Sequence, residues 1–297
     1  MRALLSGTMT ERQATKVLRD IKSRLKTSTK NVILNDRGYI FDEHLSSAGQ
    51  ARSSLYYVFK GAGVYCGKVY HPGEVASMTN EKTVSEAVHR DQHWPTLIKV
   101  IDAFHAGRHA VLILPLLAKS AADLLVATAA DVGDEATAYV CMGVLAAMAG
   151  LASNGWCHGD IKPANIMLTG DQKRVVLVDL GACTRVPELL TEFTKHYALG
   201  LPNVAGLQWD LACLASTLCL LGGIMVAKPL AHELKEELRV WEGSLSFGGQ
   251  LALHILEHLD GVNTVEKLRE DVWDKVMERV RDQLGEEHAA TLASWWP

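Results

Sequence analysis

The chain has 297 residues, 48% of them hydrophobic, and a formal net charge of -4. It is long enough to bury a full hydrophobic core, as one large domain or as two lobes. Its small negative charge argues against a protein that binds nucleic acid through its overall charge. The six cysteines form no Cys-x-x-Cys pair, which favours a reduced, intracellular protein of the cytoplasm or nucleus.

The first thirty residues predict a basic amphipathic extension. Between residues 9 and 26, apolar side chains recur at helical spacing among basic ones, namely Val17, Leu18, Ile21 and Leu25. Such a helix typically packs its apolar stripe on a neighbouring surface. A partner contact, a membrane contact and an organellar targeting peptide are the alternatives, and Glu11 and Asp20 oppose the last of these.

The next part of the chain predicts strands with one main helix. Five runs predict strands: Tyr39–Leu45, Leu55–Phe59, Val64–Tyr70, Leu97–Phe104 and Ala110–Leu117. The helix is predicted over Thr79–Asp91. Gly61-Ala62-Gly63 predicts the turn of a β-hairpin between the second and third of these strands.

The remainder of the chain predicts mostly helices. Ala138–Ser153 is small and apolar over about four turns, which is typical of a buried helix. Ile166–Leu168 and Val175–Val178 are short apolar runs around a Gly-Asp turn and predict a second hairpin. The longest apolar stretch, Leu211–Ala227, contains small residues and predicts a core helix, so we do not expect a membrane protein. Val265–Gln283 alternates charges and predicts an amphipathic helix with a solvated face.

A polar loop lies between the predicted buried helix and the second hairpin. It carries Asp160, then Lys162 two residues on and Asn165 five residues on. These side chains fit a loop that orients an attacking hydroxyl, neutralises a travelling phosphate and holds a metal ion. Asp179, at the end of an apolar strand, supplies a second metal ligand. The spacing therefore predicts a phosphoryl-transfer site.

The two motifs resemble the catalytic loop and metal site of the protein kinase superfamily. His158-Gly159-Asp160-Ile161-Lys162-Pro163-Ala164-Asn165 resembles H-R-D-x-K-P-x-N, with glycine in place of arginine. Asp179-Leu180-Gly181 resembles D-F-G, with leucine in place of phenylalanine. Among kinases, H-G-D-I-K with D-L-G looks nearest to the vaccinia-related and spindle-checkpoint families.

The resemblance implies an α+β, two-lobed protein-kinase-like fold. A β-rich small lobe with one main helix would cover residues 31–116, and a mostly helical large lobe residues 117–297. Residues 1–30 would precede them as the basic extension, with partner contact as one of its uses. Asp210 resembles the aspartate of D-x-W-x-x-G, which hydrogen-bonds the backbone of the catalytic loop.

By the same resemblance, the chain would be a serine/threonine-protein kinase that uses ATP and Mg²⁺. It would transfer the γ-phosphoryl group to a Ser or Thr hydroxyl of a protein substrate. Asp160 would orient that hydroxyl and accept its proton, and Lys162 would steady the γ-phosphate. Asn165 and Asp179 would bind Mg²⁺.

Lys68 resembles the strand lysine of V-A-I-K, which holds the α and β phosphates of ATP. In kinases, a glutamate from the following helix pairs with this lysine. Glu86 is the predicted partner, because it lies nine residues before Pro95 at the end of the helix connection, and Glu81 is the alternative.

The glycine-rich loop of kinases, G-x-G-x-x-G, is replaced by small residues that carry a Cβ. Such residues still admit backbone N–H groups to phosphate but lose free access to positive φ, which predicts a modest affinity for ATP. Leu114-Pro115-Leu116-Leu117 resembles the hinge, where a carbonyl and a later N–H bind adenine. The predicted nucleotide contacts are Ser46, Ala48, Ala51, Cys66, Lys68, Leu114, Pro115, Leu117 and Met167.

Two other functions stay open at this point. A pseudokinase scaffold is suggested by the altered glycine loop and by Pro202-Asn203, where kinases have P-E. A small-molecule kinase of the aminoglycoside or choline type also uses H-G-D and Asn. It usually lacks a lysine at the position of Lys162 and the glycine at the position of Gly181.

The glycine at position 159 also bears on whether such a kinase would need phosphorylation for activity. In kinases with H-R-D, the arginine belongs to a basic pocket that receives a phosphorylated activation-segment residue. Glycine offers no such donor, so activity is predicted not to depend on phosphorylation of the segment. The hydroxyls available there are those of Thr184, Thr191, Thr194 and Tyr197.

Overall fold

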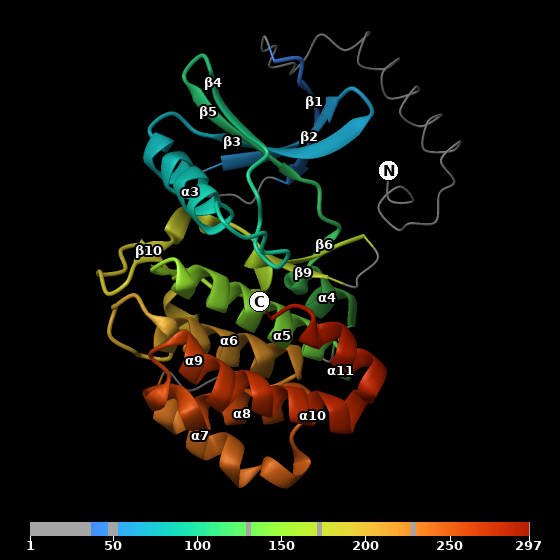
Figure 1. The fold of residues 1–297 in the computed structure, drawn as a ribbon, viewed down its shortest axis with the longest axis vertical. Helices are drawn as coiled ribbons and strands as arrows, with labels where there is room; N and C mark the ends of the chain where they lie inside the picture. The colour runs from blue at the N-terminus through green and yellow to red at the C-terminus, as the bar shows by residue number, and fades with distance from the viewer. Residues whose placement is uncertain (1–36, 47–52, 129–131, 171–173, 227–229, 297) are drawn as a thin grey trace.

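A computed structural model describes residues 37–46, 53–128, 132–170, 174–226 and 230–296. The chain folds into a small lobe built on a β-sheet and a larger helical lobe beneath it (Figure 1). The predicted basic helix between residues 9 and 26 lies outside the described residues. The division of the chain at residues 30 and 116 stays a prediction.

Over the described residues, the small lobe is a five-stranded antiparallel sheet in the order β1-β2-β3-β5-β4 with one helix, α3 (Val75–Val88). Its strands are β1 (Ile40–Ser46), β2 (Ser53–Lys60), β3 (Gly63–Tyr70), β4 (Asp102–Ala106) and β5 (His109–Pro115). The β2–β3 hairpin is confirmed, because Lys60 pairs with Gly63 across the turn. Gly61 has a φ of 60° there, a conformation that costs glycine little.

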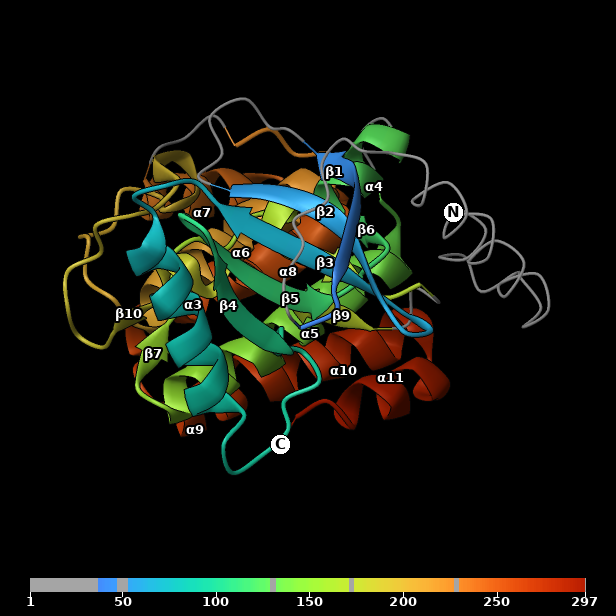
Figure 2. The same cartoon turned by 90° about the horizontal axis from the view of Figure 1, so that it is seen from above.

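An aromatic core of its own fills one side of this sheet. Tyr39, just before β1, stacks on Phe104 of β4 with ring centroids 5.7 Å apart. Because β1 and β4 are the two edge strands, this contact draws the edges of the sheet together, and Figure 2 shows β1 running steeply across the direction of β2 and β3. At Gly67 a Cβ would come within 2.5 Å of Val58 and 2.7 Å of Phe41, so the packing leaves room only for glycine.

The large lobe is mostly helical, and its described part carries five short strands. The helices are α4 (Ala121–Thr128), α5 (Asp134–Ser153), α6 (Leu207–Leu221), α7 (Ala231–Val240), α8 (Phe247–His258), α9 (Val265–Lys267), α10 (Asp274–Leu284) and α11 (Glu286–Ala293), with a π-helical stretch at Leu268–Trp273. The strands form the sheets β6-β8-β9 and β7-β10 and are β6 (Lys119–Ser120), β7 (Trp156–Cys157), β8 (Ile166–Leu168), β9 (Val175–Leu177) and β10 (Thr184–Arg185). One-turn 3-10 helices occur at Pro163–Asn165, Leu180–Ala182, Lys195–Tyr197, Glu242–Ser244 and Leu259–Gly261.

Helices α5 and α6 form the centre of the large lobe, as the two apolar runs predicted. Every side chain of α5 from Thr137 to Leu151 is buried. Among the described residues, α5 is the one helix long and apolar enough to cross a membrane, and 83% of its apolar window is buried inside the protein. A Cβ at Gly150 would lie 2.7 Å from the ring of Trp94, so this glycine lets the α5 backbone pack closely against the chain that leads back to the small lobe.

Two predicted boundaries in the small lobe are wrong. Helix α3 begins at Val75 rather than Thr79 and ends at Val88. Residues 97–100, predicted as the start of a strand, do not join the sheet, and the first bond to it is that of the Ile101 N–H to the Ile113 carbonyl of β5 at 2.8 Å. Leu97 forms a parallel bridge with Leu177 of the large lobe instead, and the N–H of Ile98 donates to the Leu177 carbonyl at 3.1 Å. These residues therefore join the lobes.

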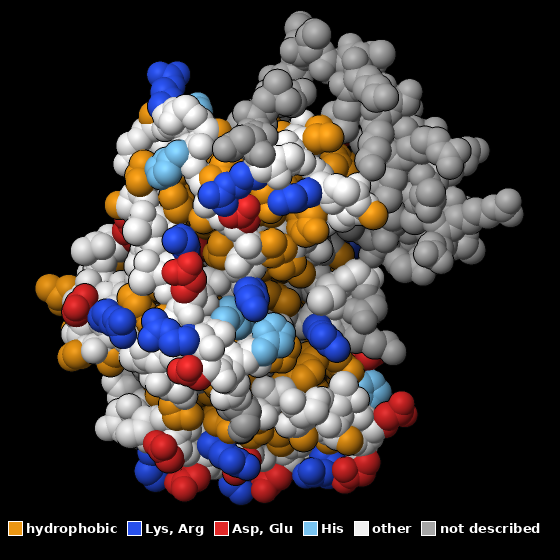
Figure 3. Space-filling view, turned by 45° about the horizontal axis from the view of Figure 1, so that its top comes forward, with side chains coloured by type: hydrophobic (Ala, Val, Ile, Leu, Met, Phe, Trp, Pro, Cys, Tyr) orange, Lys and Arg blue, Asp and Glu red, His pale blue; other side chains and the backbone are white. Residues whose placement is uncertain are grey.

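The C-terminal amphipathic pattern is observed as α9, the π-helical stretch and α10. Val276, Met277 and Val280 of α10 are buried. On its exposed side Lys275 and Glu278 pair at 3.2 Å. Acidic and basic side chains lie close together along the lower edge of the large lobe (Figure 3), so the charge pattern marks a solvated face.

Candidate active site

The polar loop between β7 and β8 is held by helix α6. Asp210 of α6 accepts hydrogen bonds from the backbone N–H groups of His158 at 2.8 Å and Gly159 at 2.9 Å. Trp209 Nε1 donates to the Gly159 carbonyl at 2.9 Å. Burial raises the pKa of Asp210, although the two N–H donors favour its ionised form. The predicted structural role of Asp210 is confirmed.

His158 fixes the other side of the loop. Its Nε2 donates to the Val178 carbonyl at 3.0 Å, while its Nδ1 accepts from the N–H of Asp160 at 3.3 Å. Because Val178 precedes Asp179, this ring ties the position of Asp160 to that of Asp179.

The carboxylate of Asp160 accepts from three donors. Its Oδ2 receives Lys162 Nζ at 2.6 Å and Asn165 Nδ2 at 3.3 Å, and its Oδ1 receives the backbone N–H of Thr194 at 2.9 Å. Asn165 Nδ2 also donates to the Asp160 carbonyl at 2.9 Å. The Asp160 side chain is 13% exposed. The loop therefore presents this carboxylate in a fixed orientation.

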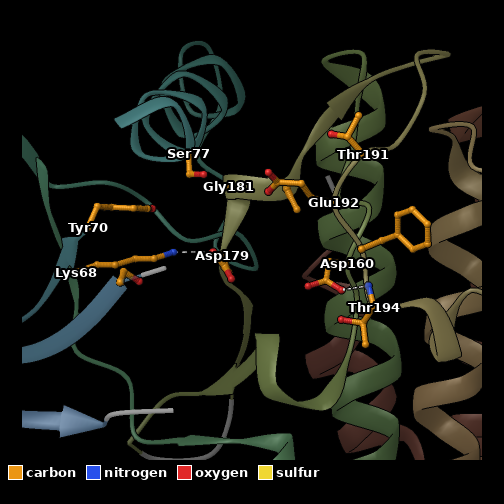
Figure 4. Close-up of a pocket in the computed structure, with 12 residues that line it drawn as sticks. Lys68, Tyr70, Ser77, Asp160, Asp179, Gly181, Thr191, Glu192 and Thr194 are labelled. Atoms are coloured by element: carbon orange, nitrogen blue, oxygen red, sulfur yellow. Dashed lines mark hydrogen bonds and ion pairs between the residues drawn. The ribbon is translucent and has the colours of Figure 1, made fainter. Parts of the chain in front are cut away.

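Thr194 is part of this network and was not among the predicted site residues. Its Oγ1 accepts from Lys162 Nζ at 2.8 Å, in addition to the bond that its N–H makes to Asp160. Figure 4 shows Thr194 beside Asp160 at the wall of the cavity. It lies 34 residues from Asp160 in the chain. The sequence marks it only as one of four hydroxyls in its segment, so no local signal singles it out.

Lys68 of β3 bridges two carboxylates from different lobes. Its Nζ lies 2.7 Å from Glu81 Oε2 and 2.6 Å from Asp179 Oδ1. Burial alone would lower the pKa of Lys68, but the charges of Asp179 and Glu81 outweigh burial and hold that pKa well above its ordinary value. The ammonium of Lys68 in turn lowers the pKa of Asp179. The lysine is thus charged and fixed in direction.

The prediction that Glu86 pairs with Lys68 is wrong. Glu86 is exposed and lies 3.5 Å from Lys82 on the outer side of α3. The buried face of α3 carries Met78, Glu81 and Val84, at intervals of three residues. Glu81 is therefore in phase with the apolar stripe, and this helical period is the sequence signal that a count back from Pro95 overlooks.

Asp179 adopts an uncommon backbone conformation. Its φ and ψ are 65° and 61°, in the left-handed region that non-glycine residues rarely occupy. Such a conformation costs about 1–3 kcal/mol and tends to occur at functional sites. Here it begins the one-turn helix Leu180–Ala182 and coincides with the ion pair to Lys68. The Asp179 side chain remains 46% exposed.

The charged groups meet in one cavity of about 450 Å³ between the lobes. Figure 4 shows Lys68 and Tyr70 on the small-lobe side, Asp179 in the middle, and Asp160 with Thr194 on the opposite side. The cavity is lined by Ser53, Lys68, Tyr70, Ser77, Asp160, Asp179, Gly181, Ala182, Thr191, Glu192, Phe193 and Thr194. Lys68 is the one predicted nucleotide contact among the described residues that lines it.

The other predicted nucleotide contacts that the structure describes do not line this cavity. Cys66 pairs with Leu114, as Tyr65 does with Pro115, in the β3–β5 ladder. Burial raises the pKa of the Cys66 thiol to about 11. Leu117 packs against the main core, and Met167 is half-buried in β8. Ser46 ends β1 opposite Leu55, whereas Ala48 and Ala51 lie outside the described residues.

The oxygen donors of the site fit Mg²⁺. The Asp179 carboxylate is partly exposed to the cavity, and Asn165, which donates through Nδ2, keeps its carbonyl oxygen as an acceptor. Among the described residues, no group of three or more His, Cys, Asp or Glu side chains is placed to hold a metal ion. Mg²⁺ usually takes one or two carboxylates and completes its shell with water and substrate phosphates.

Two lobes thus meet around a Lys–Glu pair and an Asp–Lys–Asn loop, and comparison with known proteins relates this arrangement to protein kinases. The protein kinase domain family matches residues 52–198. Serine/threonine-protein kinase YabT of Bacillus subtilis (strain 168) is 25% identical over 127 residues, 42% of this chain and 38% of its own length. Serine/threonine-protein kinase PAK 5 of Rattus norvegicus is 32% identical over 97 residues, 33% of this chain and 13% of its own length. Serine/threonine-protein kinase PAK mbt of Drosophila melanogaster is 34% identical over 101 residues, 34% of this chain and 16% of its own length.

The chain belongs to the protein kinase superfamily. The aligned segments span less than two fifths of each of these relatives. The family match ends at residue 198 and includes Lys68, Asp160 and Asp179.

Proposed function

We propose that this chain transfers the γ-phosphoryl group of ATP to Ser or Thr hydroxyls of a protein substrate. The observation that carries the proposal is the shared cavity of Lys68, Asp160 and Asp179, in which each side chain is held by partners of its own. Phosphoryl transfer needs little covalent chemistry from the protein, and positioning with charge stabilisation supplies most of the catalysis.

Each residue has a defined part in the transfer. The acceptor oxygen forms a bond to the γ-phosphorus as the bond to the bridging oxygen of ADP breaks, and the hydroxyl proton passes to Asp160. Lys162 neutralises charge on the transferred group, and Lys68, held by Glu81, orients the α and β phosphates. Asp179 and Asn165 would hold Mg²⁺, which supplies charge neutralisation on the phosphate oxygens when bound.

The contact between Lys162 and Thr194 supports a hydroxyl acceptor presented by a protein. Lys162 spans Asp160 and the segment around Thr194, so the base and the surface beside it are fixed together. An extended peptide that approaches along this segment would bring its hydroxyl to Asp160. The similarity to proteins named serine/threonine-protein kinases supports the same acceptor class.

A transfer assay separates the three candidate functions. The full chain is incubated with Mg²⁺ and γ-labelled ATP, and is offered mixed protein acceptors or aminoglycoside and choline acceptors, with Asp160→Ala as the matched control. A protein kinase labels Ser or Thr residues of the proteins, and Asp160→Ala does not. Label on the small molecules alone would assign a small-molecule kinase, and no transfer with retained nucleotide binding would assign a pseudokinase.

We also propose an intracellular location. All six cysteines are free thiols, and five of them are buried. Unpaired buried cysteines are typical of proteins from reducing compartments. Localisation of a tagged full-length chain by microscopy and cell fractionation tests this.

A further inference from the structure

Helix α3 supplies Glu81 to the site, and the residue just before Glu81 ties the helix to the large lobe. Asn80 Nδ2 donates to the backbone carbonyl of Gly181 at 2.9 Å and to that of Cys183 at 2.8 Å. Both carbonyls belong to the turn that follows Asp179. One amide group thus uses both of its hydrogens on the turn that carries the predicted metal ligand.

Tyr70 of β3 contacts the same helix, α3, from the small-lobe sheet. Its hydroxyl donates to Glu81 Oε2, the oxygen that also accepts from Lys68. Tyr70 is 2% exposed, and burial raises its pKa, so the hydroxyl keeps the proton that it donates. Lys68 Nζ lies 5.2 Å from the centre of the Tyr70 ring, and Figure 4 shows the two side chains next to each other.

Asn80 and Tyr70 connect the three elements that carry Lys68 and its two ion-pair partners. Lys68 comes from β3, Glu81 from α3, and Asp179 from the turn after β9. Tyr70 connects β3 with α3, and Asn80 connects α3 with the turn. Both are uncharged donors, so neither link requires a phosphate group.

We propose that Asn80 and Tyr70 are positioning residues that lock α3 in the arrangement in which Lys68 and Glu81 are paired. The proposal rests on the proposed function, since it concerns the geometry that binds ATP. With the lock intact, the nucleotide-competent arrangement is the resting state of the chain. Without it, α3 moves away from the turn and only a fraction of the molecules binds ATP well, so the apparent KM for ATP rises by the inverse of that fraction.

The test compares Asn80→Asp with Asn80→Ala in the full chain. The aspartate has nearly the shape of asparagine but lacks the two donors and places negative charge against two carbonyls. We expect KM for ATP to rise about tenfold in Asn80→Ala and more in Asn80→Asp, with kcat within about threefold of wild type. Tyr70→Phe, which removes one donor, should raise KM about threefold. A residue that acts only through packing would leave Asn80→Asp close to wild type, and this result would overturn the lock.

A second readout does not need activity. Thr83→Ala, on the exposed side of the same helix, is the matched control. In hydrogen exchange, Asn80→Asp should speed exchange in α3 and in residues 180–183, whereas Thr83→Ala should not. A wild type that transfers no phosphate would overturn the proposed function and leave this exchange test standing. An Asn80→Asp variant that matches Thr83→Ala in both exchange and KM would overturn the lock.

Discussion

At the scale of residues, the site depends on which carboxylate of α3 faces Lys68. Glu81 is fully buried and takes Lys68 and Tyr70 on one oxygen, whereas Glu86 pairs with Lys82 at the surface. Removing one partner of a buried pair leaves the other charge poorly compensated, while an exposed pair contributes little.

We therefore expect Glu81→Gln to lower kcat/KM for ATP by at least about 30-fold, or about 2 kcal/mol. Glu86→Gln should stay within about twofold of wild type. Steady-state transfer rates of both variants, with circular dichroism to check folding, give the comparison. Equal losses in the two variants would contradict the pairing seen here.

A second residue, His254 of α8, makes stability depend on pH. It is 5% exposed, and its Nε2 donates to the Asp271 carbonyl at 3.2 Å. Burial, with the neighbouring His258 and Arg279, lowers the pKa of His254 from 6.5 to about 4, and Glu257 opposes this only in part. The native protein therefore holds the ring neutral, while the unfolded chain protonates it near pH 6.5.

Because the pKa of His254 is lower in the native state than in the unfolded chain, the free energy of unfolding falls as the pH is lowered. The contribution of neutral His254 is fully present above pH 6.5 and is lost as the pH falls from 6.5 towards 4. The expected loss is about 3 kcal/mol at most, and His254→Gln should lack that part of the slope. Denaturant unfolding of both proteins at pH 7 and pH 4.5 measures it. The same loss in His254→Gln would assign the pH dependence to other groups.

The sequence identified the charged residues of the site better than their partners. Asp160, Lys162 and Asn165 lie within one loop, so their spacing can be recognised directly in the sequence. The partner of Lys68 depends on which face of α3 is buried, and Thr194 depends on how a distant segment folds back. Those contacts are tertiary, and a count of residues along the chain does not contain them.

At the scale of elements, the activation segment, which carries the hydroxyls of Thr184, Thr191, Thr194 and Tyr197, packs around Gly159 through Leu190. Gly159 has a φ of 80°, and a Cβ there would come within 2.8 Å of Leu190 Cδ2 and 3.3 Å of the Ala182 carbonyl. Leu190 is buried in the main core. Arg185, the segment's own arginine, lies 4.0 Å over the Trp156 ring and donates to the Asn154 carbonyl. An apolar side chain thus lies against the glycine that replaces the phosphate-receiving arginine.

This packing supports the prediction that activity does not need a phosphorylated segment. Phosphatase-treated protein, checked by mass spectrometry, should transfer phosphate within about threefold of untreated protein. A variant with Thr184→Ala, Thr191→Ala and Tyr197→Phe combined should also transfer phosphate within about threefold of wild type. Thr194 is left in place because it accepts from Lys162. A drop of more than about tenfold, or 1.4 kcal/mol, in a folded protein would contradict the prediction.

Elements whose partners are near in sequence were predicted well. The β2–β3 and β8–β9 hairpins follow from short apolar runs around turn residues, and α5 follows from its apolar composition. Residues 97–100 were predicted as part of a strand but pair through Leu97 with the large lobe. A short apolar run does not reveal which partner will bury it.

At the scale of the whole molecule, the two lobes are joined where the cavity lies. The Leu97–Leu177 bridge and the packing of Trp94 on Gly150 connect the chain after α3 to β9 and α5. Asp179 comes two residues after Leu177, so the same junction places it opposite Lys68. The two-lobed fold was predictable by resemblance, but the cavity exists only once the lobes meet.

Phosphate transfer at this junction, as proposed, depends on Asp160 as the group that orients the acceptor hydroxyl and accepts its proton. The most direct measurement is the rate of γ-phosphoryl transfer to protein Ser or Thr by wild type and by Asp160→Asn, with nucleotide binding measured on both. Asparagine keeps the shape of the side chain but cannot accept the proton. We expect Asp160→Asn to lower the transfer rate by about 10²–10⁴-fold, with binding of ATP and Mg²⁺ retained. An Asp160→Asn protein that still transfers phosphate within a few-fold of wild type would contradict it.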